Sequence, residues 1–280
     1  EEVDDALGRR LTKIMWEGPA EDLNLTVNTQ PALMAHSLAM VRALEREAKV
    51  DFADARFFAG HSLGEYSALC AARAIGLAET ARLLNTRGQA MQSAVPAGEG
   101  AMAALLGLDI AGAEKAIAET ETSLGVCEIA NDNAPGQVVI SGARPRVEAA
   151  AEAAKKHGAK MAKLLAVSAP FHCSMMAPAA GAMAKALAAA KISAPAAPIV
   201  ANVTARPVES PSEIRDLLVK QVTGRVRWTE SVDYMAREGG DKFIEIGTGK
   251  VLAGLIKRIA KEAIIMSLGE PGDIEAFLKT

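Results

Sequence analysis

The chain has 280 residues and half of them are apolar, enough to bury a full core in one large domain or in a large domain with a smaller companion. Its net charge of −3 argues against a nucleic-acid-binding protein, and its longest apolar runs fall far short of the roughly 20 residues that cross a bilayer. Three widely spaced cysteines exclude a full disulfide framework and give no zinc-ligand spacing, so we expect a reducing, cytoplasmic setting.

The first third of the chain is predicted to be mainly helical. Apolar residues at helical spacing predict helices over residues 6–16, 30–48, 63–73 and 77–94. The second of these helices has Thr29 as its cap and Pro31 in its first turn. A short apolar run over 56–60 predicts a buried strand that leads directly into the third helix.

The middle of the chain changes to short alternating elements. The pattern predicts strands over 101–107, 126–130, 137–142 and 160–167, with helices over 110–120 and 145–157. This βαββαβ order is the ferredoxin-like pattern, which would form a compact inserted subdomain.

The last part of the chain returns to longer helices between strands. Helices are predicted over 174–190, 211–222, 229–237 and 250–261, and strands over 198–202, 242–246 and 263–268. Alternating strands and helices indicate an α/β fold with a mainly parallel sheet covered on both faces.

The sequence GHSLG at Gly60–Gly64 stands between the predicted strand and its helix. In a G-x-S-x-G turn the serine takes a strained backbone conformation, and the glycines let strand and helix approach each other. The helix start behind it offers unpaired N–H groups to a developing oxyanion. Ser62 is therefore our candidate nucleophile; the alternative is a polar residue in a structural turn.

A serine nucleophile needs a base, and the chain offers four histidines. His61 is adjacent to the serine and should point to the other side of the chain, whereas His157 ends a helix and His36 lies inside one. His172 lies in a proline-containing loop between a strand and a helix, so elimination favours it as the base. Cys173 could be proposed as a nucleophile instead, but no sharp turn surrounds it.

An arginine falls within the apolar stripe of the helix over 77–94. The stripe consists of Thr80, Leu83, Leu84, Arg87, Met91 and Val95. A buried guanidinium is costly unless it is paired, so Arg87 either forms an internal ion pair or waits for a substrate carboxylate that matches its parallel N–H donors. With a catalytic serine, the second reading indicates an acyl group with a free carboxylate, and malonyl is the obvious small candidate.

Many short motifs in this order resemble the malonyl-CoA:acyl carrier protein transacylase family. They are TQPAL at Thr29–Leu33, GHSLGEYSAL at Gly60–Leu69, RGQAMQ at Arg87–Gln92, GAMAALLGL at Gly100–Leu108, NAPGQVVISG at Asn133–Gly142, SAPFH at Ser168–His172, VRWTESV at Val226–Val232 and EIGTGKVLAGLIKRI at Glu245–Ile259. Each motif alone is weak, but so many in one order are specific.

The resemblance implies a fold and a set of site residues. It implies a large α/β-hydrolase-like subdomain with a parallel central sheet, over 1–99 and 168–280, and an inserted ferredoxin-like small subdomain over 100–167. Ser62 would be the nucleophile, His172 the general base and acid, and Arg87 the partner of the malonyl carboxylate.

Three further roles come from the same resemblance. The backbone carbonyl of Gln221 would orient the catalytic histidine in place of a triad carboxylate. The N–H of Leu63 would be one oxyanion donor, and Asn131 would contact the substrate.

The sequence also departs from the family pattern. Family members begin with a strand ending in a G-Q-G-S-Q motif, whose first glutamine supplies the second oxyanion N–H. This motif is not in the sequence, and we expect the intact protein to carry it ahead of Glu1. Thr248 stands where proline is common, and its GTGK segment lacks phosphate-loop spacing and predicts a strand-to-helix turn.

The expected reaction is ping-pong transfer of malonyl from malonyl-CoA, a coenzyme A thioester substrate, to the thiol of acyl carrier protein, supplying fatty acid synthesis. The basic helix over 250–261 would dock the acidic carrier through Lys250, Lys257 and Arg258, or would simply form a solvated helix face.

We expect a monomer with no cofactor or metal and no nucleic-acid or membrane partner. The alternatives are a serine esterase or thioesterase, an acyltransferase for branched acyl groups, and an inactive scaffold in a lipid-synthesis complex.

Overall fold

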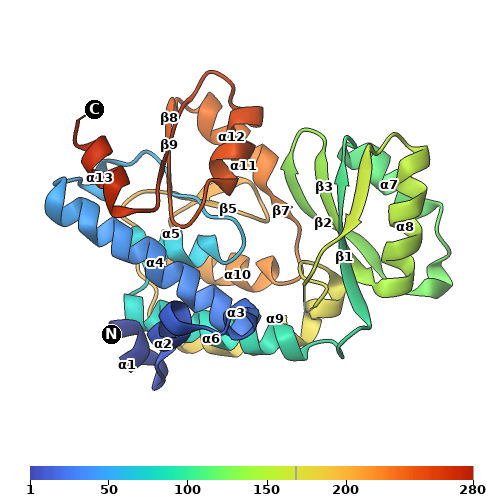
Figure 1. The fold of residues 1–280 in the computed structure, drawn as a ribbon, viewed down its shortest axis with the longest axis horizontal. Helices are drawn as coiled ribbons and strands as arrows, with labels where there is room; N and C mark the ends of the chain where they lie inside the picture. The colour runs from blue at the N-terminus through green and yellow to red at the C-terminus, as the bar shows by residue number, and fades with distance from the viewer. Residues whose placement is uncertain (168, 280) are drawn as a thin grey trace.

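The structure is a computed structural model that describes residues 1–167 and 169–279. Ser168, which opens the SAPFH motif and the second segment of the expected large subdomain, lies outside the described residues, as does Thr280. The described part is a mixed α/β fold with a five-stranded sheet at one end and both termini at the other (Figure 1). Within it, no helix has the length and apolarity needed to cross a membrane.

Helices make up most of the first third of the chain. They are α1 (Glu2–Leu7), α2 (Leu11–Glu17), α3 (Ala20–Asn24), α4 (Thr26–Glu47), η1 (Phe52–Asp54), α5 (Gly64–Ala71) and α6 (Leu77–Ser93). The single helix predicted over 6–16 is wrong, because Gly8 adopts a left-handed conformation (φ 62°) that ends α1. Thr29 does not cap α4, which begins one turn earlier, and its hydroxyl donates to the carbonyl of Leu23 (2.6 Å).

The middle of the chain forms most of the five-stranded sheet. Its strands are β1 (Gly100–Leu106), β2 (Cys127–Ala134), β3 (Gln137–Ala143), β4 (Met161–Leu164) and β7 (Val226–Arg227), in the order β4-β1-β3-β2-β7. All neighbours are antiparallel except β2 and β7, which run parallel. Two helices, α7 (Ile110–Ala118) and α8 (Arg144–Lys156), contact each other and the sheet and share a buried core with it (Figure 1).

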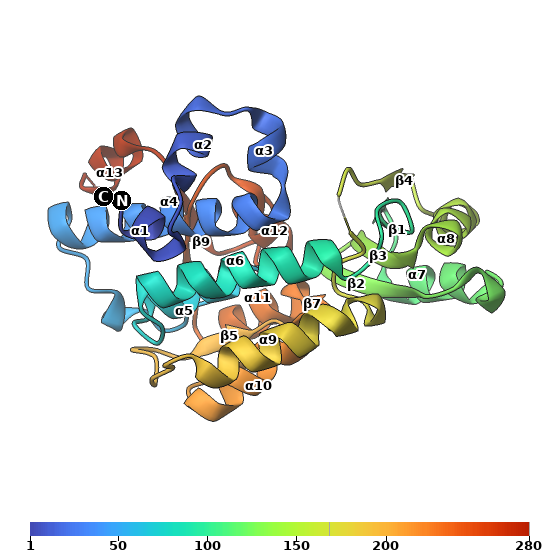
Figure 2. The ribbon, with the colours of Figure 1, turned by 90° about the horizontal axis from the view of Figure 1, so that it is seen from below.

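The rest of the chain packs around long helices. Its elements are η3 (Ser174–Met176), α9 (Ala177–Ala189), β5 (Ile199–Ala201), β6 (Arg206–Val208), α10 (Pro211–Gln221), α11 (Trp228–Arg237), β8 (Lys242–Ile246), α12 (Val251–Ile259), β9 (Ile264–Leu268) and α13 (Pro271–Phe277). Helices α6 and α9 lie side by side (Figure 2), and α4 packs across α6. The largest hydrophobic cluster lies among these helices.

The mainly parallel sheet predicted for this larger part is not continuous among the described residues. Residues 56–60 make one parallel bridge, Phe58 to Ile199, with the Phe58 N–H donating to the carbonyl of Pro198 (2.9 Å). Strand β5 then pairs with β6 antiparallel, and β8 pairs with β9 parallel in a separate two-stranded sheet. The described residues therefore do not form one continuous sheet, although two of the three pairings, Phe58 with Ile199 and β8 with β9, are parallel as predicted.

Candidate active site

Ser62 occupies a sharp turn between residues 56–60 and α5. Its φ of 53° is in the left-handed region, and its N–H donates to Oδ1 of Asn202 (2.7 Å), whose Nδ2 donates to the carbonyl of Gly60 (2.8 Å). A Cβ at Gly60 would lie 2.0 Å from the carbonyl carbon of Gly64, so only glycine fits there. A Cβ at Gly64 would meet nothing within 4 Å, so close packing requires the first glycine of the motif and not the second.

Two side chains converge on the Ser62 hydroxyl. Nε2 of His172 lies 2.8 Å from Oγ, and Nη2 of Arg87 donates to the same oxygen at 3.1 Å. His172 and Arg87 are both buried. The structure therefore brings together the nucleophile, base and guanidinium that the sequence indicated.

His172 is held by backbone carbonyls. Its Nδ1–H donates to the carbonyl of Gln221 (3.0 Å) and faces that of Gly224 (3.2 Å). Because carbonyls only accept, Nδ1 carries the proton and Nε2 is free to accept the Ser62 proton. Burial, with the nearby charges of Arg87 and His61, lowers the pKa of His172 to about 3, so the imidazole is neutral at physiological pH. The Gly224 carbonyl was not foreseen.

Arg87 is bound by neutral oxygens. Its Nη1 donates to Oε1 of Gln30 (2.7 Å), and its Nη2 donates to Oε1 of Gln221 (2.9 Å) as well as to Ser62. Nε is buried and has no hydrogen-bond partner among residues 1–167 and 169–279, and burial lowers the pKa of the guanidinium. The internal ion pair that was the alternative for Arg87 is absent from the described residues.

The sequence reasoning missed a buried carboxyl beneath the serine. Oε2 of Glu65 accepts hydrogen bonds from Nε2 of Gln221 (2.8 Å) and the N–H of Asn202 (3.1 Å). Burial raises its pKa to about 7. The available signal was a charged residue three positions after Ser62, in a helix without other charged residues. Gln30 and Asn202 were also missed, because neither has a local pattern that marks it.

Leu63 and Asn131 differ in their relation to this network. The Leu63 N–H, next to Ser62 and before the first turn of α5, donates to no acceptor among residues 1–167 and 169–279. It is thus available to an oxyanion. Asn131 is buried on β2 but makes no hydrogen bond to the Ser62 network in the described part of the chain.

The other histidines are engaged elsewhere. His36 contacts the carbonyl of Gly269 (3.0 Å), His61 contacts Asn133 (2.8 Å), and His157 contacts Glu119 (2.7 Å). Cys173 is fully buried, and burial raises the pKa of its thiol. A buried thiol with a raised pKa is a poor nucleophile.

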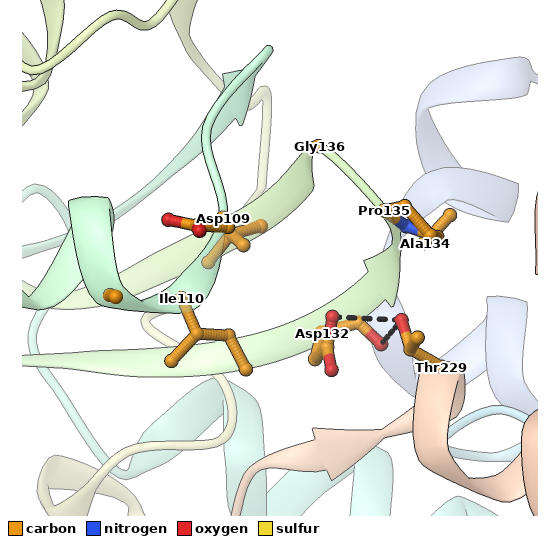
Figure 3. A pocket seen from close by; sticks show the side chains of 9 residues that line it. Asp109, Ile110, Asp132, Ala134, Pro135, Gly136 and Thr229 are labelled. Carbon is orange, nitrogen blue, oxygen red and sulfur yellow. Dashed lines mark hydrogen bonds between the residues drawn. The ribbon is translucent and has the colours of Figure 1, made fainter.

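A separate cavity of about 280 Å³ lies between the five-stranded sheet and α11 (Figure 3). Asp109, Asp132 and Thr229 are among its lining residues, and the Thr229 hydroxyl donates to the carboxylate of Asp132 (2.8 Å). None of the residues of the Ser62 network lines it. Across the described ranges, no cluster of three or more His, Cys, Asp or Glu could hold a metal ion.

Comparison with known proteins identifies the family to which this chain is similar. Residues 1–269 match the family model described as acyl transferase domain. The malonyl CoA-acyl carrier protein transacylase of Escherichia coli is 45% identical over 278 residues, covering 99% of this chain and 89% of the relative. The protein of the same name from Bacillus subtilis is 42% identical over 281 residues, covering 100% of this chain and 87% of the relative.

Solved structures give the same result. The acyl-carrier-protein-S-malonyltransferase of Bartonella henselae is 51% identical, with a TM-score of 0.96 over 99% of this chain and 88% of its own. A malonyl-transacylase in complex with a type II PKS acyl-carrier protein is 40% identical, with a TM-score of 0.95 over 99% of this chain and 89% of its own.

Proposed function

Because the chain belongs to the malonyl CoA-acyl carrier protein transacylase family of acyl transferases, we propose that it transfers a malonyl group from malonyl-CoA to the phosphopantetheine thiol of an acyl carrier protein. The observation that carries this proposal is the meeting of three groups at one atom, Oγ of Ser62, which lies 2.8 Å from Nε2 of His172 and 3.1 Å from Nη2 of Arg87. The transferred acyl group would supply fatty acid synthesis.

The first half of the reaction makes a malonyl-serine ester. Nε2 of His172 takes the Ser62 proton while Oγ attacks the thioester carbon, and the Leu63 N–H donates to the developing oxyanion. When the C–S bond breaks, the imidazolium returns its proton to the coenzyme A sulfur. A neutral imidazole with its Nε2 lone pair toward Oγ is the form that this step requires.

The second half reverses these steps with a different thiol. The phosphopantetheine thiol gives its proton to Nε2 of His172 and attacks the ester carbon, and Oγ of Ser62 leaves with the proton. The two halves form a ping-pong mechanism, because coenzyme A leaves before the carrier thiol reacts.

Arg87 would select the acyl group. A malonyl carboxylate would give the guanidinium an anionic partner in place of neutral oxygens, whereas an acetyl group would leave it without one. Such a lost charge-assisted hydrogen bond is worth about 1–3 kcal/mol. We also propose Asn131 as a substrate contact, on the basis of the family resemblance.

The subdomains and partners are part of the same proposal. We propose an α/β-hydrolase-like large subdomain over 1–99 and 168–280 and a ferredoxin-like small subdomain over 100–167, supported by separate hydrophobic clusters in the two parts. Lys257 is exposed on α12 and, with Lys250 and Arg258, would meet an acidic carrier. The protein would work as a cytoplasmic monomer without a metal or organic cofactor.

The test is the intact mass of the protein before and after brief exposure to malonyl-CoA. We expect a gain of one malonyl group that is absent from Ser62→Ala and that a pantetheine thiol removes faster than water does. Labelling of Ser62→Ala would reject this nucleophile. Release to water at the same rate as to the thiol would favour a hydrolase.

A further inference from the structure

We propose that Glu65 is a positioning residue of the acyl-transfer site, because its carboxylate sets the orientation of the Gln221 side-chain amide and thereby the positions of Arg87 and His172. The inference rests on the proposed function and assigns a role to a residue that touches none of the reacting atoms.

Glu65 is placed by the turn that carries the nucleophile. It lies in the first turn of α5, three residues after Ser62, and its side chain is buried. Its Oε2 receives two hydrogen bonds, one from Nε2 of Gln221 (2.8 Å) and one from the N–H of Asn202 (3.1 Å). Both residues also bond to Ser62, because Nε2 of Gln221 donates to its carbonyl and Oδ1 of Asn202 accepts from its N–H.

The chemistry of a carboxylate fixes which way the Gln221 amide faces. An ionised carboxylate can only accept, so Gln221 must present Nε2 to Glu65. Oε1 of Gln221 then faces Nη2 of Arg87 (2.9 Å), and Nε2 also reaches the carbonyl of Ser62 (2.9 Å). The reversed amide would set its N–H groups against the guanidinium and leave that carbonyl without this donor.

Gln221 connects this orientation to the base. It is the last residue of α10, and its backbone carbonyl accepts from Nδ1 of His172 (3.0 Å). One residue thus holds Arg87 through its side chain and His172 through its backbone. Glu65 contacts neither of these two residues by a hydrogen bond in the described part of the chain, so it acts through Gln221.

The rate of the reaction should therefore depend on whether Glu65 is ionised. Burial raises the pKa of Glu65 to about 7, against the opposing effects of its two hydrogen bonds and the charge of Arg87 on α6. The other titratable neighbours are Tyr66, whose pKa is raised far above neutrality, and His172, whose pKa is about 3. Neither titrates near pH 7, which leaves Glu65 as the group of this network that does.

The experiment measures the rate of malonyl-adduct formation from pH 5.5 to 9 in the wild type, in Glu65→Gln and in Glu213→Gln. Glu213 lies in the first turn of another helix, is exposed, and serves as the matched loss of one carboxylate. In the wild type we expect a fall of about tenfold as pH drops through 7, since the neutral carboxyl then holds Nε2 of Gln221 by a weaker hydrogen bond without charge assistance. Glu65→Gln should show the low rate at every pH, and Glu213→Gln should follow the wild type.

A second measurement needs no variant. In wild-type protein with [δ-¹³C]glutamate, one carboxyl carbon should titrate at the midpoint of the activity profile, because Glu65 is the glutamate with a raised pKa among residues 1–167 and 169–279. A flat wild-type profile, a Glu65→Gln profile that keeps the step, or the absence of any glutamate titrating above pH 6 would overturn the inference. A wild type that forms no adduct at all would overturn the proposed function together with it.

Discussion

Arg87 is held in the free protein by three neutral oxygens, one of which is Oγ of Ser62, the proposed nucleophile. Among the described residues it forms no ion pair, and the Glu65 carboxylate acts on it only at a distance, so a substrate carboxylate would be its first direct anionic partner. This arrangement makes Arg87 the residue at which acyl selectivity should be most sensitive to substitution.

We expect Arg87→Leu to lower kcat/KM for malonyl-CoA by about tenfold to a hundredfold, the loss of one charge-assisted interaction. The value for acetyl-CoA should stay level or rise, because Oγ of Ser62 loses a competing donor. Steady-state kinetics with both thioesters measures the ratio, with Arg82→Leu, an exposed arginine of the same helix, as the control. An equal fall for the two substrates would mean that Arg87 only supports the fold.

At this scale the sequence was informative where chemistry follows local patterns. The GHSLG turn identified Ser62, and the apolar stripe marked Arg87. Glu65 had a local signal that was overlooked, whereas Gln30 and Asn202 could not be found in that way, because they come from different elements and meet Ser62 and Arg87 only after the chain folds. Their signal is a set of long-range hydrogen bonds.

At the scale of elements, the contact between α4 and α6 determines where Arg87 stands. Gly88 of α6 touches the start of α4: a Cβ there would lie 2.6 Å from Cα of Val27 and 2.7 Å from the carbonyl oxygen of Thr26. Both neighbours are backbone atoms, so a rotamer change cannot relieve the overlap.

Gly88→Ala should therefore destabilise the protein by about 1–3 kcal/mol and slow malonyl-adduct formation, because α6 must move away from α4 and take Arg87 with it. Gly181→Ala on α9 is the matched control, since its Cβ would meet nothing within 4 Å and alanine favours a helix by up to about 1 kcal/mol. Urea unfolding and adduct rates measure both effects. Two variants with equal stability would contradict this account.

The elements themselves were largely predictable, and the strand pairing outside the middle region was not. The helices over 77–94 and 110–120 and the strands of the middle region match α6, α7 and β1–β4 to within a few residues. The break between α1 and α2 was not predicted, because the spacing of apolar residues carries no information about the left-handed φ of Gly8. The predicted parallel sheet is not continuous in the described part of the chain, because residues 56–60 make one bridge there, to Ile199.

At the scale of the molecule, the first residue of the segment 100–167 packs close to the loop that carries His172. Gly100 opens β1 and packs against Pro170: a Cβ at Gly100 would lie 2.3 Å from Cδ of the proline ring. Pro170 is two residues before His172. The contact between Gly100 and Pro170 thus helps to determine where the histidine loop sits.

Gly100→Ala should lower kcat by about tenfold, because the proline must shift and the distance from Nε2 of His172 to Oγ of Ser62 changes with it. The melting temperature should fall much less than the activity. Gly272→Ala is the control, since its Cβ would meet open space. Parallel losses of stability and activity would show that the glycine serves packing alone.

The two carbonyls that hold His172 have a consequence for mutational robustness. Where a side-chain carboxylate orients a catalytic histidine, a single amino-acid substitution can remove the carboxylate and leave the imidazole ring in the wrong tautomer. Here the acceptors belong to the main chain at Gln221 and Gly224, and no substitution at either position deletes a carbonyl. A substitution at either position therefore does not remove the group that holds the tautomer of His172. The sensitive positions are those that determine the path of the backbone.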